Sequence, residues 1–146
     1  MRIFLDANIL FSAVKTDGAV HAFVALLLEV GHECGADGYV VDEARRNIMG
    51  KAPGRLPHLD ELVSRVRMSA VAPSAVRAAV DGLPEKDRFV LAAAVAVECD
   101  VLVTGDRANF GKLYGRLLVG VMIHSPRSLH CGQSSPRAVG AGGTCQ

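Results

Sequence analysis

The chain contains no tryptophan, and aromatic residues make up only 5% of its 146 residues. With so few rings, base stacking cannot be a widespread means of binding, although Phe11, Phe110 and Tyr114 are candidates for it. Long hydrophobic runs are also missing, because the longest, FVLAAAVAV, has about half of the roughly 20 residues that cross a bilayer. That run therefore predicts a buried helix, and no membrane span is expected.

Two further absences narrow the class of protein. The four cysteines have no C-x-x-C spacing, which leaves zinc and redox motifs unsupported and predicts reduced thiols. The net charge is only +1, so any affinity for nucleic acid must come from local clustering of basic residues. The first residues run into RIFLD without a charged leader, so no secretory signal is predicted and a cytoplasmic protein is expected.

Hydrophobic residues make up 50% of the chain, which is ample for the core of one domain of this length. We assign this domain to residues 1–130. From Cys131 onward, CGQSSPRAVGAGGTCQ is rich in Gly, Ser and Pro, so residues 131–146 are predicted to form a disordered tail. The sequence contains no internal repeat and no sign of a second domain.

Short apolar runs alternate with longer helical segments, and this alternation is typical of an α/β domain. The clearest strand is DVLVTGD, which is apolar on both sides and therefore predicts a central strand of a parallel sheet. Further strands are expected within 2–5, 32–37, 68–73 and 119–125. Helices are expected at 19–30, 38–49, 58–67, 74–84 and 85–98, with a last helical turn from 125.

Two of the expected strands end in an acid, RIFL in Asp6 and VLVTG in Asp106. Ligands of open parallel sheets bind beyond the carboxyl ends of the strands, so these carboxylates could share one rim. Glu43 and Asp87 fall near the starts of two helices, and a helix that follows a strand begins at that same rim. Each acid taken singly could equally be a turn residue, a helix cap or a charge that complements a helix dipole.

The chemistry of carboxylates favours a shared site. Acids that converge in one cleft repel one another, so the arrangement persists only if cations neutralise them or protons are taken up. Oxygen ligands of this kind suit Mg²⁺ or Mn²⁺. One such ion with a substrate phosphate, or a pair of ions, can activate water and stabilise the leaving oxygen in phosphodiester cleavage.

Four sequence blocks, LDANILFSA, VVDEARRNI, LPEKDRFVLAAA and LVTGDRANF, follow one another in the order and spacing of a known family. Together they resemble PIN domains, the fold of many prokaryotic toxin ribonucleases of VapC type, over roughly residues 2–129. The resemblance implies a three-layer α/β/α fold with a central parallel sheet. It also implies an acidic pocket that binds Mg²⁺ or Mn²⁺, and a small antitoxin partner that inserts a segment across that pocket.

The resemblance also assigns roles to individual residues. By motif, the four acids of the family correspond to Asp6, Glu43, Asp87 and Asp106, while Asn8 and Thr104 match polar positions that orient the first and last acid. The three aspartates would hold the ion, and Glu43 would be a further ligand or the base that takes a proton from water. Attack on phosphorus in line with the leaving oxygen would leave a 3′-hydroxyl and a 5′-phosphate. Asn109 is either a helper of the last acid or merely the start of a helix.

Basic residues are concentrated near the proposed site. Residues 44–67 contain six basic and two acidic residues, a net charge of +4, whereas the whole chain carries +1. Such a cluster suits contacts with phosphates, although each member could equally lie on a solvated helix face. The residues expected to contact RNA are Arg45, Arg46, Lys51, Arg55, Arg88 and Arg107.

Other functions and assemblies are compatible with parts of this pattern. Phosphatases of the haloacid dehalogenase type also have a first strand that runs into Asp, but they need a second acid two residues later, where this chain has Asn8. A non-catalytic RNA-binding or protein-binding module could use the same fold, but four converging acids without a metal would only destabilise it.

A homodimer is common in the family and agrees with the apolar FSAV and the helix at 19–30. The preferred interpretation is a metal-dependent endoribonuclease, the toxin of a type II toxin-antitoxin pair.

Overall fold

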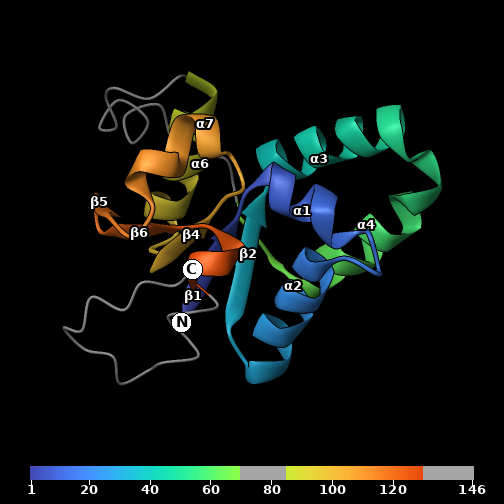
Figure 1. Cartoon of the computed structure of the whole chain (residues 1–146), viewed down its shortest axis with the longest axis horizontal. Helices are drawn as coiled ribbons and strands as arrows, with labels where there is room; N and C mark the ends of the chain where they lie inside the picture. The colour runs from blue at the N-terminus through green and yellow to red at the C-terminus, as the bar shows by residue number, and fades with distance from the viewer. Residues whose placement is uncertain (70–84, 130–146) are drawn as a thin grey trace.

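A mostly parallel sheet forms the centre of the molecule in the computed structural model, which describes residues 1–69 and 85–129, apart from the side chains of 85–87. The strand order is β3-β2-β1-β4-β6-β5, and every neighbouring pair is parallel except β5 with β6. The predicted α/β architecture with a central parallel sheet is therefore confirmed (Figure 1). The strands are β1 (Arg2–Leu5), β2 (Glu33–Asp37), β3 (Arg67–Ser69), β4 (Val101–Val103), β5 (Leu117–Leu118) and β6 (Val121–His124).

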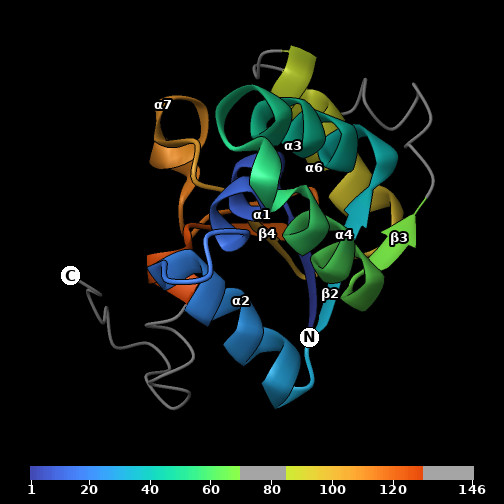
Figure 2. The ribbon, with the colours of Figure 1, turned by 90° about the vertical axis from the view of Figure 1, so that its right-hand side faces the viewer.

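Helices cover both faces of this sheet. The first four pack with one another on one face, and Figure 2 shows them in front of the strands. The chain moves outward from β1 to β2 and β3 and then returns across the sheet to β4, so right-handed crossovers place the returning helix α6 on the opposite face. The helices are α1 (Ala7–Ala13), α2 (Ala19–Val30), α3 (Gly38–Lys51), α4 (Leu56–Arg65), α6 (Glu85–Ala96) and α7 (Arg107–Phe110), with 3₁₀ turns η1 (Pro53–Arg55) and η2 (Gly111–Leu113).

The strand order reverses between β1 and β4, which is the place where open α/β sheets bind their ligands. Asp6 follows β1 directly and Thr104 follows β4 directly. The amide of Asp6 donates to the carbonyl of Val103 at 3.1 Å, and that of Thr104 donates to His124 at 3.0 Å. The ladder thus holds both residues at the carboxyl edge of the sheet.

The core lies on the two faces of the central strands. Ile3, Phe4 and Leu5 in β1 have no exposed surface, and neither have Leu102 and Val103 in β4. Continuous apolar strands are expected where helices cover both faces of a parallel sheet. Burying one such side chain stabilises the fold by about 1.5–3 kcal/mol, so the two central strands are a firm base for the residues that follow them.

The boundaries of the helices agree with the sequence where a stop signal is strong. Helix α2 occupies the expected residues 19–30 and ends because Gly31 is left-handed, with a φ of 98°. Helix α3 begins at Gly38 as expected, but it continues through Gly50 to Lys51 instead of ending at Met49. An added side chain at Gly50 would meet nothing within 4 Å, so this glycine weakens the helix without stopping it.

Other boundaries were wrong or fall outside the described residues. Helix α4 begins at Leu56, with Pro57 in its first turn, and Arg67 belongs to β3 and not to the helix expected at 58–67. The sequence did not predict α1, α7 or the short β5. The helix expected at 74–84 and the tail at 131–146 lie outside the described residues.

The described part of the chain bears on two expectations from the sequence, that no segment spans a membrane and that the cysteines are reduced. There, no helix is both long and apolar enough to cross a membrane. Cys34 and Cys99 are buried free thiols, as expected, and burial raises the pKa of each to about 11. These two thiols therefore stay protonated and behave as small apolar side chains.

Candidate active site

Asp6 is the single residue between β1 and α1, and it caps the helix. Its backbone is extended, with φ and ψ of −72° and 162°, and its Oδ1 accepts a hydrogen bond from the amide of Ala7 at 2.7 Å. The side chain is only 4% exposed, which is unusual for a carboxylate. Asp6 can therefore be both a helix cap and a site residue. The cap itself holds the carboxylate where the strand order reverses between β1 and β4.

Thr104 connects the end of β4 to the end of β1. Its hydroxyl donates to Oδ2 of Asp6 at 2.8 Å and accepts from the amide of Asp106 at 3.1 Å. The residue has no exposed surface, and its bond to Asp6 is buried, whereas its bond to the amide of Asp106 is partly buried. One buried hydroxyl thus orients the first acid and the backbone of the last acid at the same time.

Asn8 makes a second connection between the same two strand ends. Its Nδ2 lies 3.3 Å from Oδ2 of Asp6 and 3.4 Å from the Thr104 hydroxyl, and its Oδ1 accepts from the amide of Gly105 at 2.7 Å. A Cβ atom on Gly105 would lie 3.3 Å from Oδ1 of Asn8, so this close approach favours glycine. The structure therefore brings together Asp6, Asn8, Thr104 and Asp106, as their placement in the sequence motifs implies.

Asp106 is the N-cap of the short helix α7. Its Oδ1 accepts from the amide of Asn109 at 3.2 Å, and its Oδ2 accepts from the side-chain amide of the same residue at 2.9 Å. The sequence left open whether Asn109 is a helper or the start of a helix. In the structure it lies inside α7 and holds both oxygens of the Asp106 carboxylate.

Tyr114 lies beside this pair of acids, and the sequence suggested it only as a possible stacking residue. Its hydroxyl donates to the carbonyl of Thr104 at 3.0 Å. Burial raises the pKa of Tyr114, Arg107 opposes that rise, and the negative charges of Asp106 and Asp6 add to it. Through its bond to Thr104, Tyr114 is connected to the residue that holds both strand ends.

Asp37 is a further acid at this edge, and the sequence analysis did not select it. It ends β2, is 1% exposed and caps α3 by accepting from the amide of Val40 at 3.0 Å. Strand β2 pairs in parallel with β1, with Phe4 opposite Gly35, so Asp37 and Asp6 follow the carboxyl ends of neighbouring strands. The signal that selected Asp6 and Asp106, an acid at the end of a strand, was also present in ECGAD.

The two remaining predicted acids lie on helices that begin at the same edge. Glu43 is in the second turn of α3, half-buried, with its Oε2 out of contact with solvent. Asp87 is in the first turn of α6, and its side chain lies outside the described atoms. The rings of Tyr39 and Phe89 stack at 4.9 Å and 12° between planes, which joins the amino-terminal parts of α3 and α6. The backbone thus brings the helix that carries Asp87 to the start of the helix that carries Glu43.

The described donors can be compared with the needs of a metal ion. Among the side chains that the structure describes, no three His, Cys, Asp or Glu groups form a metal-binding cluster. Mg²⁺ is usually bound through one or two carboxylates, several waters and substrate phosphate. Asp6 and Asp106, which Thr104 connects, supply the two carboxylates that such an ion needs. The side chain of Asp87 lies outside the described atoms and is not counted among these ligands.

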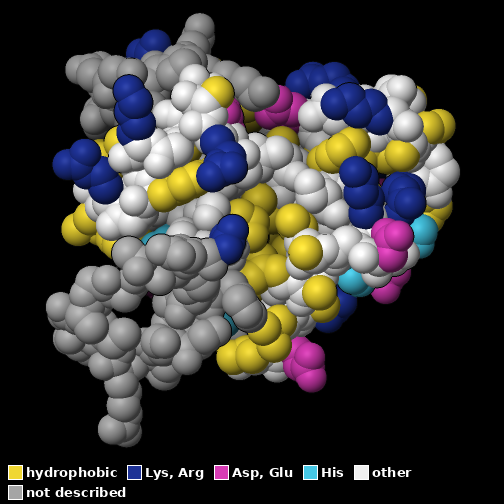
Figure 3. Space-filling model, viewed as in Figure 1, with side chains coloured by type: hydrophobic (Ala, Val, Ile, Leu, Met, Phe, Trp, Pro, Cys, Tyr) yellow, Lys and Arg dark blue, Asp and Glu magenta, His cyan; other side chains and the backbone are white. Residues whose placement is uncertain are grey.

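The basic residues expected to contact RNA differ in their surroundings. Arg45 forms a solvent-exposed ion pair with Asp60 at 3.1 Å, and Arg55 donates to the carbonyl of Val14 at 3.1 Å. Arg88 is half-buried, with an Nε that has no contact with solvent. The other three, Arg46, Lys51 and Arg107, are exposed. Figure 3 shows acidic side chains between the α3 and α6 sides of the molecule, with Lys and Arg side chains around them.

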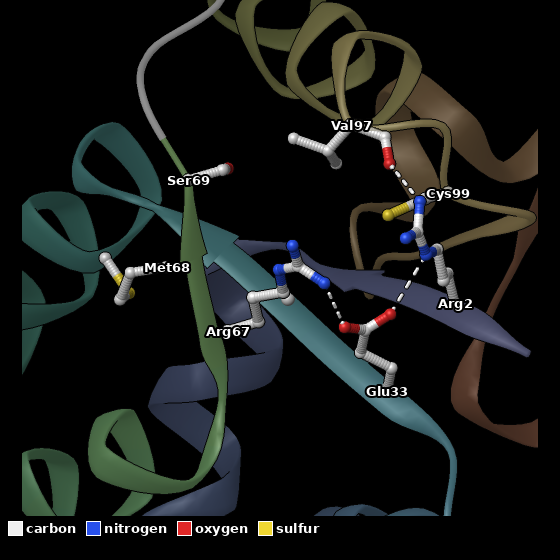
Figure 4. A pocket seen from close by; sticks show the side chains of 8 residues that line it. Arg2, Glu33, Arg67, Met68, Ser69, Val97 and Cys99 are labelled. Atoms are coloured by element: carbon white, nitrogen blue, oxygen red, sulfur yellow. Dashed lines mark hydrogen bonds and ion pairs between the residues drawn. The ribbon is translucent and has the colours of Figure 1, made fainter.

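A pocket lies away from these acids, near the amino ends of β1, β2 and β3 (Figure 4). It has a volume of about 310 Å³ and is lined in part by Arg2, Glu33, Arg67 and Cys99. Glu33 pairs with both arginines, at 2.9 Å with Arg2, and the two guanidinium groups hold the pKa of this glutamate below its usual value. Because the only carboxylate described in this lining already pairs with two arginines, we place the candidate active site at the carboxyl edge and not in this pocket.

Comparison with known proteins supports the fold. No family model and no curated protein matches the chain. The solved structure of VapBC2 from Rickettsia felis, bound to a DNA fragment from their promoter, is similar with a TM-score of 0.64 at 16% identity, over 86% of this chain and 98% of that one. FitAcB from Neisseria gonorrhoeae is similar with a TM-score of 0.59 at 17% identity, over 85% and 97%.

A third similar structure is a single toxin. VapC20 from Mycobacterium tuberculosis, described as a sarcin-ricin loop cleaving toxin, has a TM-score of 0.54 at 14% identity, over 73% of this chain and 92% of that one. At such identities the likeness concerns the fold alone. The chain therefore has the PIN-domain fold of VapC-type toxins, and the resemblance read from its four sequence blocks is confirmed at that level.

Proposed function

We propose that this protein is a metal-dependent endoribonuclease and the toxin of a type II toxin-antitoxin pair. The observation that carries the proposal is the network in which Thr104 and Asn8 hold Asp6 and Asp106 together where the strand order reverses. The fold neighbours are toxin-antitoxin structures, one of them a toxin that cleaves the sarcin-ricin loop, and this supports RNA as the substrate.

In the proposed site, Asp6 and Asp106 would hold Mg²⁺ or Mn²⁺, together with Asp87 from the first turn of α6. Such an ion, when bound, stabilises negative charge on the phosphate and helps to activate water. Thr104, Asn8 and Asn109 keep the carboxylate oxygens of the two described aspartates in fixed directions. Glu43 is a further ligand or the base that accepts the proton of the attacking water. Because water and not the 2′-hydroxyl attacks phosphorus, the products are a 3′-hydroxyl and a 5′-phosphate.

The basic residues bind the RNA backbone. Arg45, Arg46, Lys51 and Arg55 follow Glu43 on α3 and η1, and Arg88 and Arg107 follow the aspartates on α6 and α7. Phosphate contacts of this kind give affinity that falls with salt and does not depend on base sequence.

The proposal includes a protein partner. The VapBC and FitAB neighbours favour an antitoxin partner, and the family resemblance implies that this antitoxin is small and covers the acidic site. A homodimer is a further part of the proposal, because Leu26 and Val30 of α2 are 42% and 60% exposed. A cytoplasmic location follows from RNA as the substrate and also stays a proposal.

Of the alternatives, the aspartate-nucleophile phosphatase gains no support from the site. That chemistry needs an acid two residues after Asp6, and Asn8 there uses its amide to link Asp6, Thr104 and Gly105. A non-catalytic binding module is distinguished from the nuclease by experiment.

The test is cleavage of end-labelled structured RNAs with Mg²⁺, Mn²⁺ or EDTA. Asp6→Asn and Asp106→Asn keep a good helix cap but remove the charge, so we expect folded proteins without cleavage or calorimetric Mn²⁺ binding. Glu98→Gln is the control, since Glu98 is exposed and precedes β4, at the amino end of the sheet and not at its carboxyl edge. Glu43→Gln is expected to lower the rate by about a hundredfold or more, and its exposed neighbour gives the matched control Asp42→Asn. Cleavage that survives in both aspartate variants contradicts the assigned site, and binding of RNA without any cleavage supports the non-catalytic module.

A further inference from the structure

A ring and two ammonium groups form a small cluster beyond the acids. The Nζ atoms of Lys15 and Lys51 lie 5.6 Å and 5.4 Å from the centroid of the Phe11 ring. Both distances are within the range of a cation-π interaction, which holds a flexible lysine near an aromatic ring. Lys15 follows the end of α1 and Lys51 is the last residue of α3, so the ring connects two helices that lie next to each other in the fold (Figure 2).

The charge of this cluster is not balanced within the described residues. Both lysines are exposed, and the ion pairs described for the chain involve Arg2, Arg45 and Arg67 but neither lysine. Asp17 is two residues from Lys15 and makes no ion pair with it. Arg55 adds a third positive charge close by, since its guanidinium donates to the carbonyl of Val14. Two ammonium groups on one ring, with a guanidinium bound at the residue before Lys15 and no described carboxylate in an ion pair with any of them, are suited to a polyanion.

The position of the cluster relates it to the proposed active site. Helix α1 begins at Asp6, and Phe11 follows five residues later, about 7.5 Å along the helix axis. Helix α3 carries Glu43, and Lys51 lies eight residues beyond it, about 12 Å along its axis. Both helices therefore lead from the acidic edge to the same ring.

We propose that Lys15 and Lys51, held in place by the Phe11 ring, clamp the phosphates of the RNA strand that extends from the scissile bond. Arg55 supplies further positive charge at the edge of the clamp. The ring acts as a scaffold and not as a stacking surface, because the two ammonium groups occupy the space around it. This inference rests on the proposed function, since it names a contact of the same substrate. An acidic segment of a protein partner is the competing occupant, but phosphates match paired lysines with no need for a particular sequence.

The test measures binding and not cleavage. A short fluorescein-labelled single-stranded RNA is titrated with the protein in EDTA, and anisotropy is recorded at several salt concentrations. For single strands, each lost phosphate contact reduces the magnitude of the slope of log affinity against log salt by about 0.7. At about 0.1 M salt, that loss weakens the affinity for RNA about fivefold. We expect that loss for Lys15→Gln and for Lys51→Gln, and about 25-fold for the double variant.

Two further variants separate charge from structure. Arg116→Gln removes an exposed positive charge before β5, away from the cluster, and is expected to leave the affinity and the slope unchanged. Phe11→Leu keeps an apolar side chain but releases both lysines, so we expect weaker binding with an unchanged slope, because the number of phosphate contacts stays the same.

The outcomes distinguish this inference from the proposed function. If the wild type binds and cleaves RNA but the double lysine variant behaves like Arg116→Gln, the clamp is wrong and the nuclease remains. If the double variant keeps its RNA affinity but no longer binds the antitoxin, the cluster is a protein-docking surface, which also overturns the clamp. If the wild type neither binds nor cleaves RNA, both proposals fail.

Discussion

The hydroxyl oxygen of Thr104 lies 2.8 Å from Oδ2 of Asp6, so a side chain at the end of β4 holds a carboxylate at the end of β1. The same oxygen accepts from the amide of Asp106 at 3.1 Å. The two strand ends are distant in sequence, and the network forms only when β1 and β4 pair. The geometry of the site is therefore a direct result of the topology of the sheet.

Replacing Thr104 by Val tests this arrangement. Valine has the same shape but leaves Oδ2 of Asp6 without the hydroxyl that donates to it, so we expect the free energy of unfolding to fall by about 1–3 kcal/mol. RNA cleavage should fall as well, because the acids lose their common support. Thr104→Ser keeps the hydroxyl and is the control. Urea unfolding and cleavage rates are measured together, and equal activity in the Val and Ser variants would show that the hydroxyl has no role in the site.

Gly105→Ala is expected to disturb the site through Asn8. The new Cβ would lie 3.3 Å from Oδ1 of Asn8, closer than most such contacts, so the amide of Asn8 must move. We expect lower cleavage and a modest loss of stability. Gly50→Ala is the matched control, since it adds a methyl group in open space within α3 and should stabilise the protein by about 0.5–1 kcal/mol. A Gly105→Ala variant with full activity would contradict the tight contact.

Asp37 predicts a pH dependence of stability. Burial raises the pKa of its carboxyl above the usual 3.8, although the amides of Val40 and Tyr39 lower it in part. The folded state then binds the proton more tightly than the unfolded state, so this contribution to stability is present in acid and is lost as the pH rises through the raised pKa. Asp37→Asn keeps a capping side chain and cannot ionise.

The comparison of wild type and Asp37→Asn by urea unfolding measures this effect. We expect the stability of the variant, relative to the wild type, to increase from acid to neutral pH. Asp17→Asn, at an exposed site, is the control for a general change of charge. If the stability of the variant relative to the wild type instead decreases from acid to neutral pH, Asp37 is stabilised as a carboxylate in the folded protein and the prediction is wrong.

The sequence predicted those parts of the fold that depend on local signals. Gly31 ended α2 where expected, because a left-handed residue is required there. Gly50 did not end α3, since an exposed glycine costs only a fraction of the stability that packing along a helix supplies. Helix α1 was missed because seven residues are too few for a helical period to be recognised, and Asp6 begins it through a cap that reads equally well as a turn.

The candidate site was predictable to the extent that its residues stand at the ends of elements. Asp6 and Asp106 were selected because each follows an apolar strand, and the structure places them together. Asp37 has the same placement but follows a weak strand containing Gly35, so its burial could not be anticipated. The clustering of Lys15 and Lys51 around Phe11 depends on the packing of α1 against α3, which no local pattern encodes.

Tyr114→Phe tests a residue that only the structure connects to the acids. The variant loses the hydrogen bond to the carbonyl of Thr104, worth about 1 kcal/mol, and keeps the packing of the ring. We expect a lower kcat with little change in KM, because Tyr114 supports the acids and not the bound strand. Phe110→Leu, which alters the fully buried neighbour in α7, is the control for packing. A change confined to KM would instead make Tyr114 a contact of the RNA.

Phe89→Leu tests how the first turn of α6, and with it Asp87, is held at the acidic edge. The ring of Phe89 stacks on Tyr39 of α3, an interaction worth about 0.5–1.5 kcal/mol beyond burial. Leucine removes the stack but keeps an apolar contact, so we expect weaker Mn²⁺ binding together with a small loss of stability. Phe23→Leu, in a buried position of α2, should cost similar stability without any change in Mn²⁺ affinity. If calorimetry finds the same Mn²⁺ affinity in both variants, Asp87 either reaches the site without the help of the stack or does not bind the ion.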